Sequence, residues 1–568
     1  MVSANGAMAQ ESDGAGSGSE SETAVVSGTD SASGDGESTE NTPSQDASND
    51  GSTSQGKGKS QGKGKVSKGG AYGGRSTGPS PLPLLPADPA YPVPNPPTND
   101  ALPSEIDVIE PWQPNIVCDP INRPGVEAFG NLLGQTYDRT GYSGSRVCID
   151  QKSEHHDGRA IDWSLDAFDP ADRRIGDSVA TWLTENDGEM AKRFGIQSVI
   201  WNKHSWRPNG QGWQGYVGQS AHTDHIHFSF TWDGAMMRTS WWTGVALEQV
   251  DQGPCAVVAG QYAAIPVGIR TQPCPTGLIS APDSGYVSVR PGGSGAGVGL
   301  VQPLLGVSET GVLDAATHKA LLDWQDEKGI PQTGVLDQLT YTAALGRDLP
   351  TIPEAGLAVP LPDFMTTRYT PYARIVLQEG SSGPAVEVLQ KALGVEPDGA
   401  FGPATGKALL AFTTKNSLLN ASEKTTPLLW HVLELKDYPT LPLRQSAVEV
   451  GDEGVAVAKA QELLGAKADG RFGPNTEKAV RAAQKKAGLE VTGVMDGATW
   501  AALDRGAPTT SAKKDSAKKD SAATKSSAKK KAATKDAAKK AKAKKAKAKK
   551  ASAKDVRGGK LDPSTVRD

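Results

Sequence analysis

The sequence predicts a multidomain protein: an α+β domain with a small antiparallel sheet, then three small helical domains, with a disordered segment at each end. At 568 residues the chain is too long for a single domain. Five of its eight histidines fall in two short pieces, residues 153–162 and 222–229, which places the candidate chemistry in one region. Related segments recur three times in the C-terminal half, and this repetition indicates tandem domains.

Residues 1–103 lack the apolar side chains that a core requires. Glu11 to Asp50 contains ten acidic residues and no basic one, a composition that is typical of disorder. A short Gly-Lys run follows, and then PSPLPLLPADPAYPVPNPP, whose prolines favour an extended polyproline II conformation. We therefore expect a disordered arm over residues 1–103, first acidic and then proline-rich.

The sequence favours an exported, secreted protein. No apolar run reaches the length of a transmembrane helix. A positive start followed by an apolar stretch, as in a complete signal peptide, is not found after Met1. Ala7-Met8-Ala9 nevertheless has the small-x-small pattern of a cleavage site, so we expect upstream codons to encode the rest of an export signal.

The four cysteines agree with export. They pair in sequence order as Cys118–Cys148 and Cys255–Cys274, and neither spacing is that of a zinc knuckle. A bond between Cys118 and Cys148 would fix the first helix to the strand that carries the histidine motif. Free thiols are the alternative interpretation.

The α+β domain is expected over residues 104–250. Helical spacing of apolar residues predicts helices at 126–133 and 177–193, whereas 198–202 and 225–230 read as strands. Six tryptophans lie between residues 201 and 242, and most of them fit core or rim positions.

Two pieces of this domain, SEHHDGRAID and HTDHIHFS, together predict a metal site. Alternation along a strand places His225, His227 and Ser229 on one face. A second strand that presents Asp162, preceded by a turn that presents His155, would bring these ligands to the same point. Zinc is bound by such nitrogen and oxygen ligands, and catalytic sites keep a fourth position for water. His225, one pleat away, is placed to exchange protons with that water.

The first piece resembles a known motif. Ser153, His155, Gly158, Ala160 and Asp162 match S-x-H-x-x-G-x-A-x-D of the D-alanyl-D-alanine metallopeptidases, which share a zinc-peptidase superfamily with lysostaphin and the hedgehog signalling domain. The resemblance implies an α+β zinc-peptidase fold with Zn²⁺ as the cofactor.

The resemblance also implies roles for individual residues. The metal ligands would be His155, Asp162 and His227. Asp224, three residues before the last ligand, would be the general base, and Arg146 would lie near the substrate carboxylate or the developing oxyanion. Aspartate at the base position is similar to the branch that cuts the L-alanyl-D-glutamate bond of peptidoglycan stems. An ideal strand would turn Asp224 away from the site, so either a loop carries it there or His225 or His222 takes this role.

Residues 251–286, rich in Pro, Gly and Ala, are expected to form a connector that the second disulfide staples. Beyond it, LQEGSSGPAVEVLQKALGVEPDGAFGPATGKAL (from Leu377) matches VEVGDEGVAVAKAQELLGAKADGRFGPNTEKAV (from Val448) at a constant offset of 71 residues. An earlier copy has Thr310-Gly311 where these two have Asp-Gly. All three copies resemble the three-helix peptidoglycan-binding domain, with the DG-x-FGP loop as candidate contact. We place the repeats at residues 287–347, 370–436 and 443–505.

Residues 506–568 form a Lys/Ala-rich segment that we expect to be a disordered tail. Between Ser511 and Asp555 it has eighteen lysines and four aspartates, so the formal charge of −5 for the whole chain hides a strongly basic end. This segment is suited to bind wall polyanions. A nucleic-acid-binding protein is not favoured, because no basic fold lies outside the tail.

These observations predict an exported zinc metallopeptidase that hydrolyses the stem peptides of peptidoglycan and is held on the wall by its repeats. Its partners would be the stem peptide and the glycan. The cleavage would be of the L-Ala-D-Glu endopeptidase or D,D-carboxypeptidase/endopeptidase type. The alternative is a non-catalytic wall-binding or scaffold protein with a vestigial zinc domain.

Overall fold

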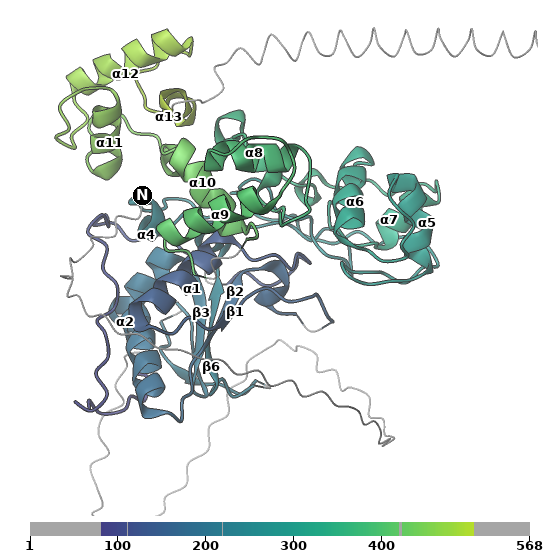
Figure 1. Cartoon of the computed structure of the whole chain (residues 1–568), viewed down its shortest axis with the longest axis horizontal. Helices are drawn as coiled ribbons and strands as arrows, with labels where there is room; N and C mark the ends of the chain where they lie inside the picture. Colours follow the sequence, from purple (N-terminus) through teal and green to yellow (C-terminus); the bar gives the residue numbers. More distant parts are fainter. Residues whose placement is uncertain are drawn as a thin grey trace, which may run out of the picture. The chain divides into compact units, whose positions relative to one another are not determined.

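The computed structural model describes residues 81–504, except 111, 151, 209, 219 and 420–422 (Figure 1). The acidic part of the predicted arm and the predicted basic tail lie outside the described residues. Within the described part of the chain, no helix has the length and apolar character needed to cross a membrane.

The N-terminal folded region is built on a six-stranded antiparallel sheet, which confirms the small antiparallel sheet predicted for this region. The strand order is β1-β2-β6-β3-β4-β5, so β2 and β6, which carry the two histidine-rich pieces, are neighbours. The strands are β1 (Tyr142–Ser143), β2 (Ala160–Ser164), β3 (Ile196–Trp201), β4 (His204–Trp206), β5 (Gln214–Gly215) and β6 (His225–Phe230).

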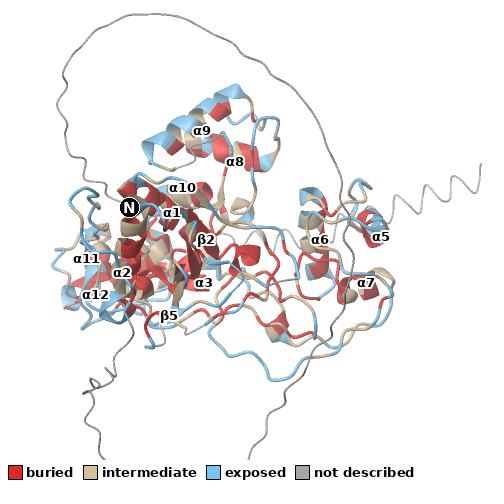
Figure 2. Ribbon diagram, turned by 90° about the horizontal axis from the view of Figure 1, so that it is seen from below, coloured by how far each residue is buried: buried red, intermediate tan, exposed pale blue. Residues whose placement is uncertain are grey.

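Helices α1 (Pro124–Tyr137) and α2 (Pro170–Phe194) pack against this sheet (Figure 1). Apolar side chains of both helices and of the strands form one fully enclosed core, which appears as the buried centre of the sheet region in Figure 2. Because side chains alternate along a strand, Ile161 and Phe228 enter this core while Asp162 and His227 point to the opposite face. The helices therefore leave one face of the sheet for the polar cluster.

Helix α2 differs in detail from the helix predicted over 177–193. It begins earlier, at Pro170, because the Asp169 side chain accepts hydrogen bonds from the backbone N–H groups of Ala171 and Asp172. Residues 185–188 have non-helical backbone angles, so α2 is two helical segments joined at an irregular turn. Short helices α3 (Trp232–Ala235) and α4 (Ser240–Thr243) follow β6.

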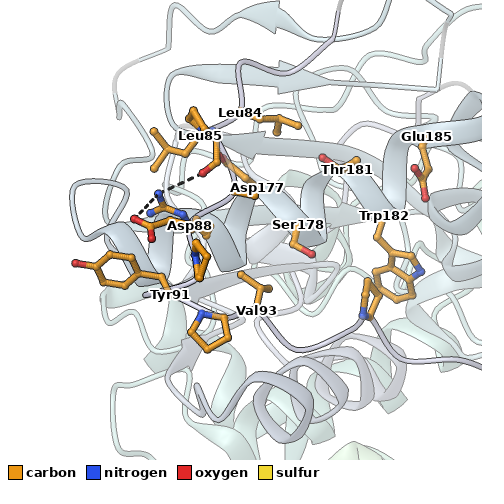
Figure 3. A pocket seen from close by; sticks show the side chains of 16 residues that line it. Leu84, Leu85, Asp88, Tyr91, Val93, Asp177, Ser178, Thr181, Trp182 and Glu185 are labelled. Atoms are coloured by element: carbon orange, nitrogen blue, oxygen red, sulfur yellow. Dashed lines mark hydrogen bonds and ion pairs between the residues drawn. The ribbon is translucent and has the colours of Figure 1, made fainter.

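The expectation of a disordered arm up to residue 103 is corrected for residues 81–103, which pack on the folded region, with residues 84–96 beside α2. Leu82 is buried in the main core, and the backbone N–H of Leu85 donates to the Asp177 carboxylate at 3.0 Å. Arg173 in turn donates to the carbonyl of Pro83 at 2.7 Å. The prolines do keep this segment extended, but tertiary contacts hold it in place. A cavity of about 630 Å³ lies between it and α2, lined by Tyr91 and Trp182 among others (Figure 3).

Both predicted disulfides, Cys118–Cys148 and Cys255–Cys274, are present. The first lies beside the histidine motif, because both Cys148 Sγ and the backbone N–H of Asp119 contact the carbonyl of His156. In the segment predicted as a connector, Val257 and Val258 are buried in the same core as the first repeat. That segment is thus more than a spacer.

Each of the three repeat segments contains three helices and a core of its own. In the first these are α5 (Ala296–Leu305), α6 (Ala315–Glu327) and α7 (Gln338–Ala344). In the second they are α8 (Pro384–Leu393), α9 (Pro403–Lys415) and α10 (Pro427–Asp437), and in the third α11 (Val455–Leu463), α12 (Pro474–Ala487) and α13 (Gly497–Leu503).

A buried glutamine organises the loops of these repeats, and we call this arrangement the glutamine node. In the Gln461 node, the side-chain amide donates to Asp469 Oδ1, the Arg471 carbonyl and Thr476 Oγ1, while its oxygen accepts from the N–H of Gly470. The same bonds, at the same spacing, recur at four further glutamines: Gln302, Gln325, Gln390 and Gln484.

The nodes expose a shorter repeat inside the longer one. Gln302 and Gln325 are 23 residues apart, as are Gln461 and Gln484, so the first and third repeats each contain two half-repeats. The second repeat has Thr413 where its second glutamine would fall, and it keeps a single node.

Candidate metal centre

His155 is held by a tight turn before β2. It lies on a 3₁₀ helix, η1 (Glu154–Asp157), which is capped by Ser153 and by Gly158, where φ is +74°. Only glycine fits here, since an added Cβ would lie 1.8 Å from the carbonyl oxygen of Ile121. The imidazole Nδ1 is 2.7 Å from the Gly144 carbonyl, so this nitrogen carries the proton and Nε2 faces the cluster.

Asp162 and His227 are brought together by strand register. They are directly paired across β2 and β6, so their side chains leave the same face of the sheet. Asp162 is 6% and His227 8% exposed, which keeps both ligand candidates nearly free of competing water.

Three side chains converge on one point: His155 Nε2, Asp162 Oδ1 and His227 Nδ1 lie within 4.8 Å of one another. The three separations are 3.2 Å between His155 and Asp162, 3.3 Å between His155 and His227, and 2.8 Å between His227 and Asp162. Ligands about 2.0 Å from a tetrahedral zinc ion are about 3.3 Å apart. The residues therefore fit a zinc ion in both donor type and spacing.

Protonation in the folded state suits metal binding. Burial opposes the charged form of Asp162, but its contacts with the rings of His155 and His227 outweigh this effect and lower the pKa of the carboxyl. Burial lowers the pKa of His227 to about 4, although Asp162 partly offsets this effect. Near neutral pH the pair thus offers a carboxylate and a neutral imidazole, the forms that bind metal.

The structure separates the two residues predicted to be acid–base groups. His225 Nε2 lies 3.4 Å from Asp162 Oδ1, at the edge of the cluster. Asp224 precedes the first residue of β6, and its side chain is 82% exposed. Its carboxylate accepts from His225 Nδ1 at 3.0 Å. Asp224 therefore contacts the cluster through His225 and does not face it.

Two further polar groups border the cluster. Arg146 donates to the second carboxylate oxygen of Asp162 and is half-exposed, so one end of the site is cationic and open to solvent. His222 is buried, with its ring centroid 4.8 Å from that of His225. Burial lowers the pKa of His222, which favours its neutral form.

Sequence reasoning missed the groups that contact the ligand imidazoles at the ring nitrogen facing away from the cluster. Gly144 supplies a carbonyl to His155, and the Ser229 hydroxyl lies 2.8 Å from His227 Nε2. Ser229 donates in turn to Glu154 at 3.4 Å. The strand alternation that places Ser229 on the same face as His227 was a signal for the hydroxyl. No sequence pattern pointed to Glu154.

Comparisons with known proteins match parts of the chain. Residues 122–227, which end at His227, match the VldE C-terminal domain. Residues 459–503, within the third repeat, match a putative peptidoglycan binding domain. No solved structure matches.

A relative is the N-acetylmuramoyl-L-alanine amidase CwlL of Bacillus licheniformis, which is 34% identical over 131 residues. This similarity covers 22% of the present chain and 35% of the amidase. The chain thus spans about a third of the relative's length, and the chain is related to a cell-wall hydrolase over that part alone.

Proposed function

We propose that this protein is a zinc-dependent peptidoglycan hydrolase that cleaves peptide stems, as an L-Ala-D-Glu endopeptidase or a D,D-carboxypeptidase/endopeptidase. The proposal is carried by the convergence of His155, Asp162 and His227 within 4.8 Å, in a segment that matches the VldE C-terminal domain. The peptidoglycan-binding match at residues 459–503 supports the choice of substrate. We also propose a secreted or wall-associated location, which the two disulfides favour.

In this mechanism His155, Asp162 and His227 hold the ion. Zinc, when bound, supplies a water of lowered pKa and polarises the scissile carbonyl. His225 is the proposed acid–base group, because its Nε2 lies 3.4 Å from Asp162 whereas Asp224 is turned to solvent. Asp224 would orient His225 by accepting from its Nδ1. Arg146, beside Asp162 and half-exposed, would bind a substrate carboxylate or the oxyanion.

The helical repeats would hold the enzyme on its insoluble substrate. We propose domains at 104–250 for the peptidase and at 287–347, 370–436 and 443–505 for peptidoglycan binding, with 251–286 between them. Three linked modules raise the effective concentration of the peptidase at the wall.

The experiment is digestion of purified sacculi with and without a chelator. We expect new products whose release depends on zinc. Their identity shows which bond of the peptidoglycan is cleaved. A new amino terminus on D-glutamate indicates the endopeptidase, and free D-alanine indicates the carboxypeptidase. A new amino terminus on L-alanine would indicate amidase activity of the kind in the relative's name. Binding to sacculi without any product would support the non-catalytic alternative instead.

A further inference from the structure

Both candidate histidine ligands have their outer ring nitrogen engaged, but by different partners. His155 donates from Nδ1 to the backbone carbonyl of Gly144 at 2.7 Å. His227 has no such carbonyl at its Nε2, which faces the Ser229 hydroxyl at 2.8 Å. A carbonyl can only accept, so it fixes the His155 tautomer by itself. A hydroxyl can donate or accept, so Ser229 alone leaves the His227 tautomer undecided.

Glu154 removes this ambiguity. Its Oε2 lies 3.4 Å from Ser229 Oγ and is the acceptor for the hydroxyl proton. The hydroxyl proton of Ser229 is therefore directed to Glu154, and the oxygen lone pair is left to accept from His227 Nε2–H. His227 Nδ1, on the cluster side, then keeps a free lone pair. That is the atom within 2.8 Å of Asp162.

We call the chain of contacts from His227 through Ser229 to Glu154 the relay, and it is buried. Ser229 is 1% and Glu154 9% exposed, so water does not compete for these bonds. Ser229 lies two residues beyond His227 on the same strand, and Glu154 is the first residue of η1, directly before His155. One short turn thus provides the first ligand and the anchor of the third.

We propose that Ser229 and Glu154 are positioning residues that set the affinity of the metal centre by fixing the tautomer and orientation of His227. This inference rests on the proposed function and deepens it. Partners of ligand histidines in other metal sites typically contribute 10–100-fold to metal affinity. We expect an effect of about that size here, transmitted through Ser229.

The first test compares zinc affinity, measured by chelator competition, in wild type, Ser229→Ala and Ser229→Thr. Ser229→Ala should bind zinc about 10–100-fold more weakly, and Ser229→Thr, which keeps a hydroxyl, should restore most of the loss. Ser198→Ala is the matched control, because Ser198 pairs with Ser229 across β3 and β6 and is also buried. Equal affinity of Ser229→Ala and wild type would overturn the proposal.

The second test asks whether the two residues act in series. Glu154→Gln alone should weaken zinc binding, but adding it to Ser229→Ala should cause no further loss, because the relay is already broken. Additive losses would show two independent packing effects and would refute the relay. This test stands even if one variant is less stable, provided that thermal melting of the metal-free proteins is compared first.

A spectroscopic readout separates the relay from general destabilisation. In zinc-loaded wild type, the Nε2–H proton of His227 should be visible by NMR and slow to exchange, and Ser229→Ala should lose this signal. Failure of wild type to bind zinc or to cleave sacculi would instead refute the proposed function. Retained zinc binding and cleavage in all relay variants would refute the relay alone.

Discussion

The metal centre and the glutamine nodes are both polar clusters that include buried side chains, but they are assembled in opposite ways. The centre is a single site built from His155, Asp162 and His227, so 72 residues separate its outer histidines. Each node lies within 15 residues of its glutamine, and the described chain has it five times.

This difference predicts different responses to damage. A single long-range site depends on the register of β2 against β6, and the loss of one ligand removes its function. A local node depends on one loop, and its loss is confined to one half-repeat while the other copies persist. Mutations should therefore abolish chemistry at the centre but change only local stability at a node.

The largest effect is expected from Asp162→Asn. The variant should lose zinc binding and hydrolysis of sacculi, because an amide is a far weaker ligand than a carboxylate, while sedimentation with sacculi is retained. Asp187→Asn, on the surface of α2, is the control and should behave as wild type. If Asp162→Asn kept zinc-dependent activity, the metal centre would be wrongly placed.

The second effect concerns proton transfer. His225→Ala should lower turnover by about 10²–10⁴-fold at nearly unchanged zinc affinity. Asp224→Asn should lower it less, since Asp224 acts through His225. The pH dependence of turnover and chelator competition would be measured for both variants. An equal loss of turnover in His225→Ala and Asp224→Asn would indicate that Asp224 is the general base after all.

The third effect tests the nodes. Gln461→Ala removes the amide that bonds the buried Thr476 hydroxyl and three more exposed groups, and should destabilise the third repeat by about 1–3 kcal/mol. Hydrogen exchange should locate the change to that repeat, with hydrolysis of a soluble stem peptide unaffected. Gln378→Ala, at an exposed glutamine, is the control. Lower zinc affinity in Gln461→Ala would contradict the separation of the two regions.

The smallest expected effect is a difference in acid sensitivity between the Gln461 node and the Gln484 node. Hydrogen bonds from Gln461 and from the N–H of Arg471 lower the pKa of Asp469, whereas the Gln484 node has Thr492 at the same place. A carboxyl with a lowered pKa stabilises the fold above its unfolded pKa of about 4 and loses this contribution as the pH falls. The loop of Asp469 should therefore open in acid before the loop of Thr492. Hydrogen exchange below about pH 4 would show this, and Asp469→Thr should abolish it.

The local structure, the set of candidate metal ligands and the two disulfides were predictable from the sequence, whereas the packing contacts around them were not. Alternation in HIHFSF predicts β6 and the face of His227, and the turn at Gly158 follows from the spacing of the first motif. The partner of Ser229 was not predictable, because Glu154 approaches it only once η1 and β6 are packed together. Likewise, the prolines predict an extended segment but not its contact with α2.

One missed feature was present in the sequence. Thr310 to Asp314 and Thr333 to Asp337 both read TGVLD, and Thr492 to Asp496 reads TGVMD. These three strings mark the half-repeats, and each ends at the aspartate that begins the next helix. Comparing the sequence with itself at an offset of 71 residues reveals the long repeat but not the shorter period of 23 residues.

Gly158 makes the metal centre vulnerable at a residue that would never touch the metal. A single methyl group at this position would overlap the Ile121 carbonyl, and the turn would have to move away from its neighbour. His155 moves with that turn, and so does Glu154 behind His227. One added carbon would thus disturb two of the three ligands at once, and a chain with every ligand in place but a different residue here should be read as inactive.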